Sequence, residues 1–299
     1  MLRRGYTRAQ IQREHIIAVV IIWVVLTAIG IGLASLDVYP TTGSVQAEDF
    51  DSIFRILMYI GMPVLTLVFT ILGYGIFVWG NRKQPAQDGP AQYGHGWVPR
   101  VWLLITGGLA AFVMVWPGLT GLAALQSEYT AAGWGSPEAR LTVDVEAQQW
   151  AFTYRFFEGI CPESLQEEIL EEAPGLISEP VERSGCSMVA VVFPSTTEGN
   201  FNLIKVPAGE EVKFEIQSLD VLHSFWIPAF RTKIDAIPGR ITYMTIEPTI
   251  FGSYTNDAAY RVQCAELCGA DHTIMRSNIE VVDRDAFDEW IRSVQKDGQ

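Results

Sequence analysis

The sequence predicts a membrane-anchored all-β protein, in which transmembrane helices are followed by a Greek-key β-sandwich. Three long apolar runs without a charged side chain occupy the first 125 of the 299 residues. From residue 126 onward, short β-rich runs alternate with proline and glycine breakers. We therefore expect two domains, a membrane anchor at 1–125 and an external domain at 126–299.

The apolar runs lie at 16–36, 56–79 and 101–125. Each has at least 21 residues, which is long enough for a helix to cross a hydrocarbon core about 30 Å thick. Basic residues dominate before the first run and between the second and third, whereas the loop after the first run is acidic. The positive-inside rule then places the N-terminus in the cytoplasm and the external domain on the periplasmic side. We expect a multi-pass protein of a bacterial-type plasma membrane.

The first apolar run has a second interpretation. A basic segment followed by apolar residues also describes a secretory signal. Because this run is longer than a usual signal, we favour a retained anchor, with cleavage near residues 34–46 as the alternative. None of the three runs contains an Asp, Glu, Lys, Arg or His, so the anchor itself carries no predicted proton relay.

The external domain shows the alternation of apolar and polar residues that is typical of β-strands. Leu141–Glu146 alternates apolar and polar residues, and aromatic residues recur at every second position from Trp150 to Phe156. Further β-rich runs, separated by turn residues, predict a Greek-key sandwich; they lie at 187–193, 200–206, 211–217, 241–247, 258–263 and 277–282. An apolar stripe predicts a closing helix at about 284–295.

The net charge of the external domain restricts the kinds of molecule that it could bind. It holds 28 acidic and 13 basic residues, a net charge of −15. This excess disfavours binding to nucleic acid or to an anionic membrane surface, and it would attract a basic soluble partner. Acidity that serves only solubility is the alternative.

An acidic insertion interrupts the strand pattern. Residues 158–182 contain eight glutamates and no basic residue, and Cys161 and Cys186 bracket the segment. In an oxidising external compartment, a disulfide between these cysteines that closes the insertion is expected. A second metal site is the alternative, but the segment lacks further ligands.

The stretch from Cys264 to Met275 contains two thiols, an imidazole and a thioether within twelve residues: Cys264, Cys268, His272 and Met275. These soft to borderline ligands suit copper better than magnesium, calcium or manganese. His223 is the only other histidine of the external domain, so it is the one further imidazole available. A disulfide between the two cysteines, or reduced cysteines in a core, is the alternative.

Three motifs resemble the copper-A domain of subunit II of haem–copper terminal oxidases: Asp220–Phe225, Lys233–Arg240 and Cys264–Met275. The resemblance implies a cupredoxin-like sandwich with a dinuclear copper centre. Cys264 and Cys268 would bridge both coppers, and His223 and His272 would each bind one. Met275 and the backbone carbonyl of Glu266 would be weaker ligands.

The resemblance also implies two outer residues and a set of partners. The Glu266 carboxylate matches one that reaches magnesium at the interface with subunit I, and Trp150 matches the tryptophan where electrons arrive from cytochrome c. The chain would then be the electron-accepting subunit of an oxidoreductase, passing electrons to haem in subunit I for reduction of dioxygen to water. Without the resemblance, Trp150 would be assigned to the core and Glu266 to a solvated loop.

Two other functions fit the same ligands. One is the copper-A subunit of a nitric oxide reductase, and the other is a membrane-anchored copper storage or delivery protein. Three features depart from the family pattern. The first apolar run is extra relative to the usual two-helix subunit, and the separation of His223 from Cys264 is several residues longer than typical, which suggests an enlarged hairpin. The acidic insertion lies near the expected docking face of the electron donor.

Overall fold

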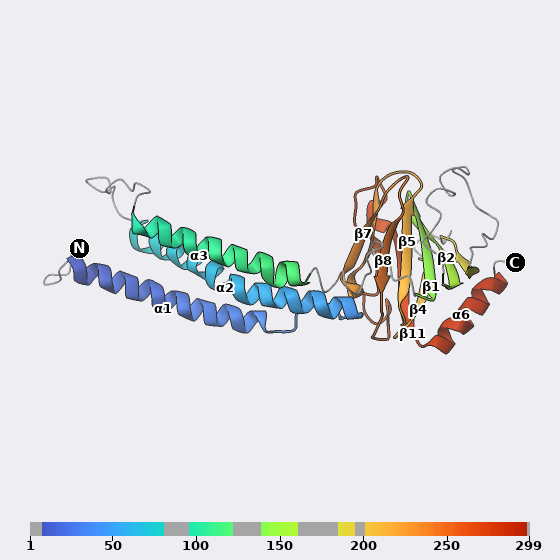
Figure 1. The fold of residues 1–299 in the computed structure, drawn as a ribbon, viewed down its shortest axis with the longest axis horizontal. Helices are drawn as coiled ribbons and strands as arrows, with labels where there is room; N and C mark the ends of the chain where they lie inside the picture. Colours follow the sequence, from blue (N-terminus) through green and yellow to red (C-terminus); the bar gives the residue numbers. More distant parts are fainter. Residues whose placement is uncertain (1–7, 81–95, 122–138, 161–184, 195–200, 298–299) are drawn as a thin grey trace. The chain divides into compact units, whose positions relative to one another are not determined.

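The computed structural model describes residues 8–80, 96–121, 139–160, 185–194 and 201–297. The chain divides into two compact units, a helical one and a β one (Figure 1). The helical unit comprises the chain up to Val38 and Ser52–Gly121, whereas Tyr39–Asp51 belongs with the β unit. Most of the acidic insertion, including Cys161, lies outside the described residues.

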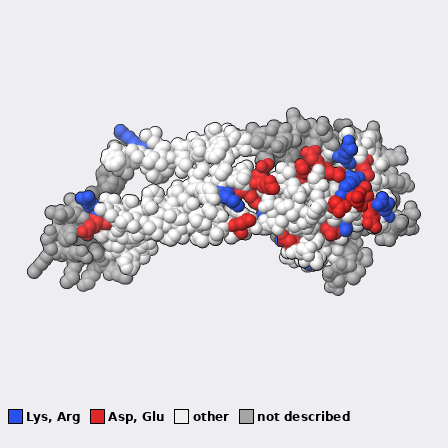
Figure 2. All heavy atoms as spheres, turned by 90° about the horizontal axis from the view of Figure 1, so that it is seen from below, with Lys and Arg blue, Asp and Glu red and all other residues white. Residues whose placement is uncertain are grey.

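The helical unit is built from α1 (Arg8–Ala34), α2 (Val45–Trp79) and α3 (Trp97–Val113). The segment η1 (Met114–Leu119) follows α3 and contains a kink at Trp116. Three stretches are long and apolar enough to cross a membrane: Gln12–Ala34, Val45–Val78 and Pro99–Leu119. Charged side chains are sparse along these helices (Figure 2). The described parts of the three apolar runs therefore form helices as predicted, although α2 begins at Val45, well before residue 56. The last four residues of the third run, 122–125, lie outside the described residues.

Polar groups join α1 to α2 inside the apolar unit. The indole nitrogen of Trp23 donates to the Pro63 carbonyl at 2.7 Å, and the hydroxyls of Thr27 and Thr66 lie 2.7 Å apart. Hydrogen bonds of this kind hold helices together where no hydrophobic driving force exists between them. The first helix is thus packed specifically against the second.

Pro117 shapes the end of the third helix. Trp116, the residue before it, has extended backbone angles of φ −137° and ψ 122°. A proline ring clashes with a preceding residue in the helical region, so such residues move to the extended region. The regular helix consequently ends at Val113.

The β unit is a sandwich of two mixed sheets (Figure 1). The first sheet has the order β3–β2–β1–β5–β8, with β1 Leu141–Gln148, β2 Ala151–Gly159, β3 Cys186–Val192, β5 Val212–Ser218 and β8 Thr242–Ile246. The second has the order β4–β11–β10–β6–β7, with β9 pairing β11; the strands are β4 Leu203–Pro207, β6 His223–Ile227, β7 Thr232–Ala236, β9 Gly252–Ser253, β10 Arg261–Cys264 and β11 Arg276–Val282.

One continuous core lies between the two sheets. It buries alternate residues of strands from both, among them Val143, Val145, Phe214, Ile216, Phe225, Ile279 and Val281. β1 runs parallel to β5 and β4 runs parallel to β11, whereas the other pairs are antiparallel. The fold predicted from the sequence, apolar helices followed by a β-sandwich, is confirmed.

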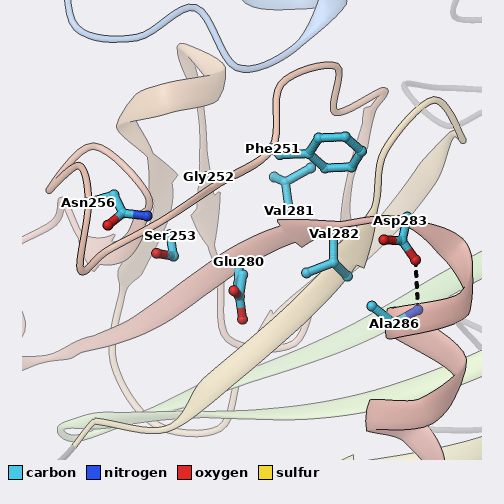
Figure 3. A pocket seen from close by; sticks show the side chains of 9 residues that line it. All are labelled: Phe251, Gly252, Ser253, Asn256, Glu280, Val281, Val282, Asp283 and Ala286. Atoms are coloured by element: carbon cyan, nitrogen blue, oxygen red, sulfur yellow. Dashed lines mark hydrogen bonds between the residues drawn. The ribbon is translucent and has the colours of Figure 1, made fainter.

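The closing helix α6 (Arg284–Asp297) matches the predicted one. The Asp283 carboxylate caps it by accepting a hydrogen bond from the Ala286 amide at 2.8 Å (Figure 3). Its aromatic residues Phe287 and Trp290 pack on Phe156 of β2, with ring centroids 6.3 and 5.3 Å away. The helix therefore covers one part of the core (Figure 1).

The segment after α1 is built into the β unit. The Gly43 amide donates to the Ala229 carbonyl at 2.8 Å, and the Thr249 amide donates to the Gly43 carbonyl at 2.9 Å. Arg231 donates to both carboxylate oxygens of Asp51, at 2.9 and 3.0 Å. These bonds attach residues 39–51 to the sandwich.

Candidate metal centre

Two neighbouring strands carry the first ligands of the predicted site. His223 begins β6 and Cys264 ends β10. The strands pair antiparallel, with Cys264 opposite Phe225. The chain between them folds back as the hairpin of β6 and β7, in which His223 pairs with Ala236. Strand pairing, and not sequence distance, therefore brings the two ligands together.

The predicted copper ligands converge around the two thiols. Cys264 Sγ lies 3.8 Å from Cys268 Sγ and 3.9 Å from His223 Nδ1. Cys268 Sγ lies 3.5 Å from His272 Nδ1 and 3.8 Å from Met275 Sδ. His223, both cysteines and Met275 are buried, whereas His272 is half-buried.

These separations fit ligands of a shared soft cation. Thiolate and imidazole donors about 2.0–2.3 Å from one ion lie roughly 3.3–3.8 Å apart in a tetrahedral arrangement. His223, Cys264 and Cys268 offer donor atoms that all lie within 4.8 Å of one another. The chemistry of the donors, two thiols, two imidazoles and a thioether, is also that of a copper site.

Asp220 fixes the orientation of His223. Its Oδ1 lies 2.8 Å from His223 Nε2. Partial burial works against ionisation of Asp220, but hydrogen bonds from the Gln149 amide, His223 and the Val221 amide hold its pKa below the usual range. A carboxylate only accepts, so Nε2 carries the proton and Nδ1 is left with its lone pair toward Cys264. This is the outer support typical of a histidine that binds metal.

Burial governs the ionisation of Cys268. Together with the charge of the neighbouring Cys264, it raises the pKa of the Cys268 thiol to about 12. Both cysteines are free of disulfides. A buried thiol of this kind ionises at neutral pH only when a cation offsets the charge, so binding of a metal displaces its proton.

The ligand loop is closed by the sheet. The Cys264 amide donates to the Met275 carbonyl at 3.0 Å, and the Ala265 amide donates to the Ser224 carbonyl at 3.0 Å. Between these points the loop contains a short 3-10 helix, η3 (His272–Ile274), which turns His272 back toward Cys268. Backbone hydrogen bonds therefore position the donor atoms.

The backbone and the side chain of Glu266 have different surroundings in this loop. Its backbone carbonyl accepts a hydrogen bond from the Cys264 thiol at 3.2 Å, which places it beside the predicted ligands. Its side chain is exposed. The predicted roles of the carbonyl and of the carboxylate thus belong to opposite sides of the residue.

Trp150 lies next to the ligand loop. Its indole nitrogen donates to the Cys268 carbonyl at 3.2 Å, and the side-chain amide of Gln149 donates to the same carbonyl at 2.7 Å. The residue is half-buried and precedes β2, so it lies in the β1–β2 turn and not on the strand to which the aromatic pattern assigned it.

The remaining predicted residues lie away from this centre. Cys186 begins β3 and is buried and disulfide-bonded; its predicted partner Cys161 is outside the described residues, so the pairing stays a prediction. The surface hollow in Figure 3, of about 320 Å³, is lined by residues of β9, β11 and α6 and contains none of the predicted ligands.

The sequence assigned no role to two residues of the centre, Gln149 and Asp220, although Asp220 begins one of the three family motifs. Asp220 stands three residues before His223, a spacing at which a carboxylate after a strand can reach back to an imidazole. Gln149 had no comparable signal, because its partner Cys268 is 119 residues away. Contacts of that separation follow only from the folded sheets.

Comparison with known proteins finds relatives of one kind. Residues 189–282 match the family described as cytochrome C oxidase subunit II, periplasmic domain. The chain is 28% identical over 244 residues to the alternative cytochrome c oxidase subunit 2 of Bradyrhizobium diazoefficiens, covering 81% of this chain and 78% of the relative. It is 29% identical over 245 residues to a probable cytochrome c oxidase subunit 2 of Rickettsia prowazekii, covering 82% and 67%.

Other matches are more partial. A probable cytochrome c oxidase subunit 2 of Streptomyces avermitilis is 29% identical over 171 residues, and the match spans 55% of this chain and 52% of the relative. Among solved structures, the periplasmic domain of subunit II of cytochrome oxidase of Bradyrhizobium japonicum is 26% identical, with 55% of this chain and 99% of that chain covered and a TM-score of 0.36. Residues 189–282 are thus similar to the periplasmic domain of cytochrome c oxidase subunit II, and the curated relatives of the longer match are subunits 2 of cytochrome c oxidase.

Proposed function

We propose that this chain is the electron-accepting subunit of a respiratory cytochrome c oxidase and holds a dinuclear copper-A centre. The observation that carries the proposal is the convergence of two thiols, two imidazoles and a thioether within 3.5–3.9 Å contacts. These ligands would occupy the coordination positions of the metals and leave none for a substrate. Such a site favours electron transfer over substrate turnover. The reduction of dioxygen to water belongs, in this proposal, to haem in subunit I.

Each ligand has a distinct task. Cys264 and Cys268 would bridge the metals, His223 and His272 would each bind one, and Met275 with the Glu266 carbonyl would complete the set. A copper pair bridged by two thiolates supplies a site that takes up and releases one electron with little change in its bonds. The chain's contribution is to hold these groups still.

The surroundings restrict movement of the ligands. Asp220 keeps the proton of His223 on Nε2, so that Nδ1 stays a donor atom. The backbone bond from Cys264 to Met275 closes the loop at both ends. Low rearrangement on electron uptake follows from such a preorganised environment.

Trp150 is the proposed point at which electrons arrive from cytochrome c or a similar carrier. Its hydrogen bond to the Cys268 carbonyl offers a short covalent and hydrogen-bonded route to a bridging thiol. The net charge of −15 over residues 126–299 favours a basic donor. The exposed Glu266 carboxylate is the proposed magnesium ligand at the contact with subunit I, and the sandwich would lie on the periplasmic side of a multi-pass anchor.

Copper reconstitution of the full-length chain in detergent tests the centre. The wild-type chain should bind two coppers with a mixed-valence spectrum, and C264S should lose that spectrum. The matched control is S277A, which removes a buried polar side chain of β11 without touching a ligand. One mononuclear copper, or a spectrum that does not depend on Cys264, would show the proposal to be wrong.

Purification of the intact complex tests the reaction. An oxidase should consume dioxygen with reduced cytochrome c, and the rate should fall as salt screens the acidic domain. Consumption of nitric oxide without dioxygen would point instead to a nitric oxide reductase. Readily exchangeable Cu(I) with no haem partner would point to copper storage or delivery.

A further inference from the structure

Gln149 makes two hydrogen bonds to groups that surround the ligand set. Its backbone amide donates to Asp220 Oδ2 at 2.7 Å, while Oδ1 of the same carboxylate contacts His223. Its side-chain amide donates to the Cys268 carbonyl at 2.7 Å. One turn residue thus connects the support of an imidazole ligand with the backbone of a thiol ligand.

The second bond also concerns Trp150. The Cys268 carbonyl accepts from the Gln149 amide and from the Trp150 indole together. Gly269 follows directly, and a Cβ there would lie 3.0 Å from Gln149 Nε2 and 3.2 Å from two atoms of the Trp150 ring. The turn and the ligand loop are therefore in close contact, with no room for a side chain between them.

A structural role for Gln149 in the turn alone does not account for its side chain. β1 and β2 are already paired up to the turn, with Gln148 opposite Ala151. The Gln149 side chain is exposed overall, yet its amide is directed at a carbonyl of the ligand loop instead of solvent. A polar side chain at the surface can form its hydrogen bonds with water at little cost in free energy. The bond from Gln149 to Cys268 therefore indicates a role in holding the ligand loop.

We propose that Gln149 is a positioning residue of the metal centre, which holds the Cys268 backbone and the Trp150 indole in register. The expected effect on the reduction potential rests on the proposed copper function. The expected effect on the order of the ligand loop does not depend on it. The partial positive charge of an amide donor close to the centre also favours the more electron-rich, reduced form, and so raises the reduction potential of a bound metal. Loss of the donor should lower that potential.

The test compares Q149M with Q148M in the full-length chain. Both replace a glutamine of the same turn region with a side chain of similar length that lacks a donor, but only Gln149 contacts Cys268. In the metal-free protein, the backbone amides of residues 264–275 should exchange hydrogen about fivefold faster in Q149M than in the wild type. One intramolecular hydrogen bond contributes about 1 kcal/mol, which changes the equilibrium constant for local opening by about that factor. Q148M should match the wild type.

The copper-loaded protein gives the second measurement. The reduction potential should fall in Q149M and fall further in Q149E, whose carboxylate adds negative charge beside the carbonyl, while copper content stays the same. If Q149M fails to fold, Q149N carries the test, because its amide is one methylene too short to reach Cys268. Equal exchange rates and equal potentials in Q149M and Q148M would overturn the proposal.

The exchange measurement separates this proposal from the copper function. If the chain binds no copper pair, the proposed function fails, yet faster exchange in metal-free Q149M still supports a positioning role. If copper binds normally and neither exchange nor potential responds to Q149M, the function stands and the role of Gln149 is refuted.

Discussion

Replacement of Gly269 by alanine should disturb the ligand loop more than replacement of any glycine in an open turn. Gly269 has φ +122°, well outside the left-handed region near +50 to +70° that other residues tolerate. Holding a side chain in such a region costs about 1–3 kcal/mol. The new Cβ would also lie 3.0 Å from Gln149 Nε2 and 3.2 Å from the Trp150 ring, so these groups must move and the bonds to Cys268 weaken.

The loss of one or two hydrogen bonds adds about 1 kcal/mol, which brings the expected destabilisation of G269A to about 2–4 kcal/mol. For a domain of this size, each kcal/mol lowers the unfolding temperature by roughly 2–4 °C, so a drop of roughly 4–16 °C follows. G209A is the matched control, because Gly209 has φ +73° and no atom within 4 Å of the added Cβ. It should cost about 1–2 kcal/mol.

Thermal unfolding of the metal-free, full-length variants, followed by near-ultraviolet circular dichroism, measures both effects. Tryptophan fluorescence should also change in G269A, because the crowding displaces the Trp150 indole from the Cys268 carbonyl, and it should stay unchanged in G209A. Equal unfolding temperatures for the two variants, or an unchanged indole signal in G269A, would show that the turn and the loop are not in the contact described.

Three further changes should have distinct effects. R231M should destabilise the β unit by about 3 kcal/mol, because it leaves the half-buried Asp51 carboxylate without its bidentate partner; urea unfolding measures this, and D51N should be milder. Y154F should cost about 1–2 kcal/mol, since Tyr154 is fully buried and donates to Ser277 at 2.9 Å; a loss below 0.5 kcal/mol, roughly the size of a neutral surface change, would contradict the bond. Alkylation of Cys268 in the metal-free chain should keep accelerating up to about pH 12, because its pKa is raised to about 12, and a plateau near pH 9 would contradict the burial of this thiol.

The raised pKa of Cys268 has a matching effect on stability. A thiol whose pKa is higher in the folded than in the unfolded chain favours folding while it stays protonated. Its contribution is therefore complete below the ordinary thiol pKa of about 8.5 and is lost as the pH rises toward 12. The metal-free protein should lose stability over this alkaline range, whereas bound metal, which needs the thiolate, should remove the effect.

The parts of the fold that depend on local pattern could be predicted from the sequence. Long uncharged runs predicted the helices of the anchor, and alternation of apolar and polar residues predicted β1. Short β-rich runs predicted most of the later strands, and an apolar stripe predicted α6. The hairpin strand β7 is missing from the predicted strands, because Thr232–Ala236 mixes exposed charges with few apolar residues. Its strand conformation comes from pairing with β6 and not from its own composition.

Contacts across long separations could not be predicted. Residues 39–51 look like a linker by composition, yet Arg231, 180 residues away from Asp51, fixes the segment to the sandwich. Arg231 itself has φ 56°, a conformation that no sequence pattern indicated. The same limit applies to Gln149 and Cys268, whose contact depends on how the β1–β2 turn meets the end of the second sheet.

The attachment of residues 39–51 bears on the first helix. Cleavage of a signal after Gly43 would remove the backbone bonds of Gly43 to Ala229 and Thr249, whereas cleavage at 34–42 would leave them in place. Cleavage anywhere within 34–46 would detach α1 from the chain that contains α2, although Trp23 and Thr27 bond to groups of α2. A signal peptide that is discarded has no need for such specific contacts. The contacts between α1 and α2 therefore favour a retained helix. Mass spectrometry of the mature chain from membranes should find residues 12–34 present, and a mature N-terminus between 34 and 46 would contradict this.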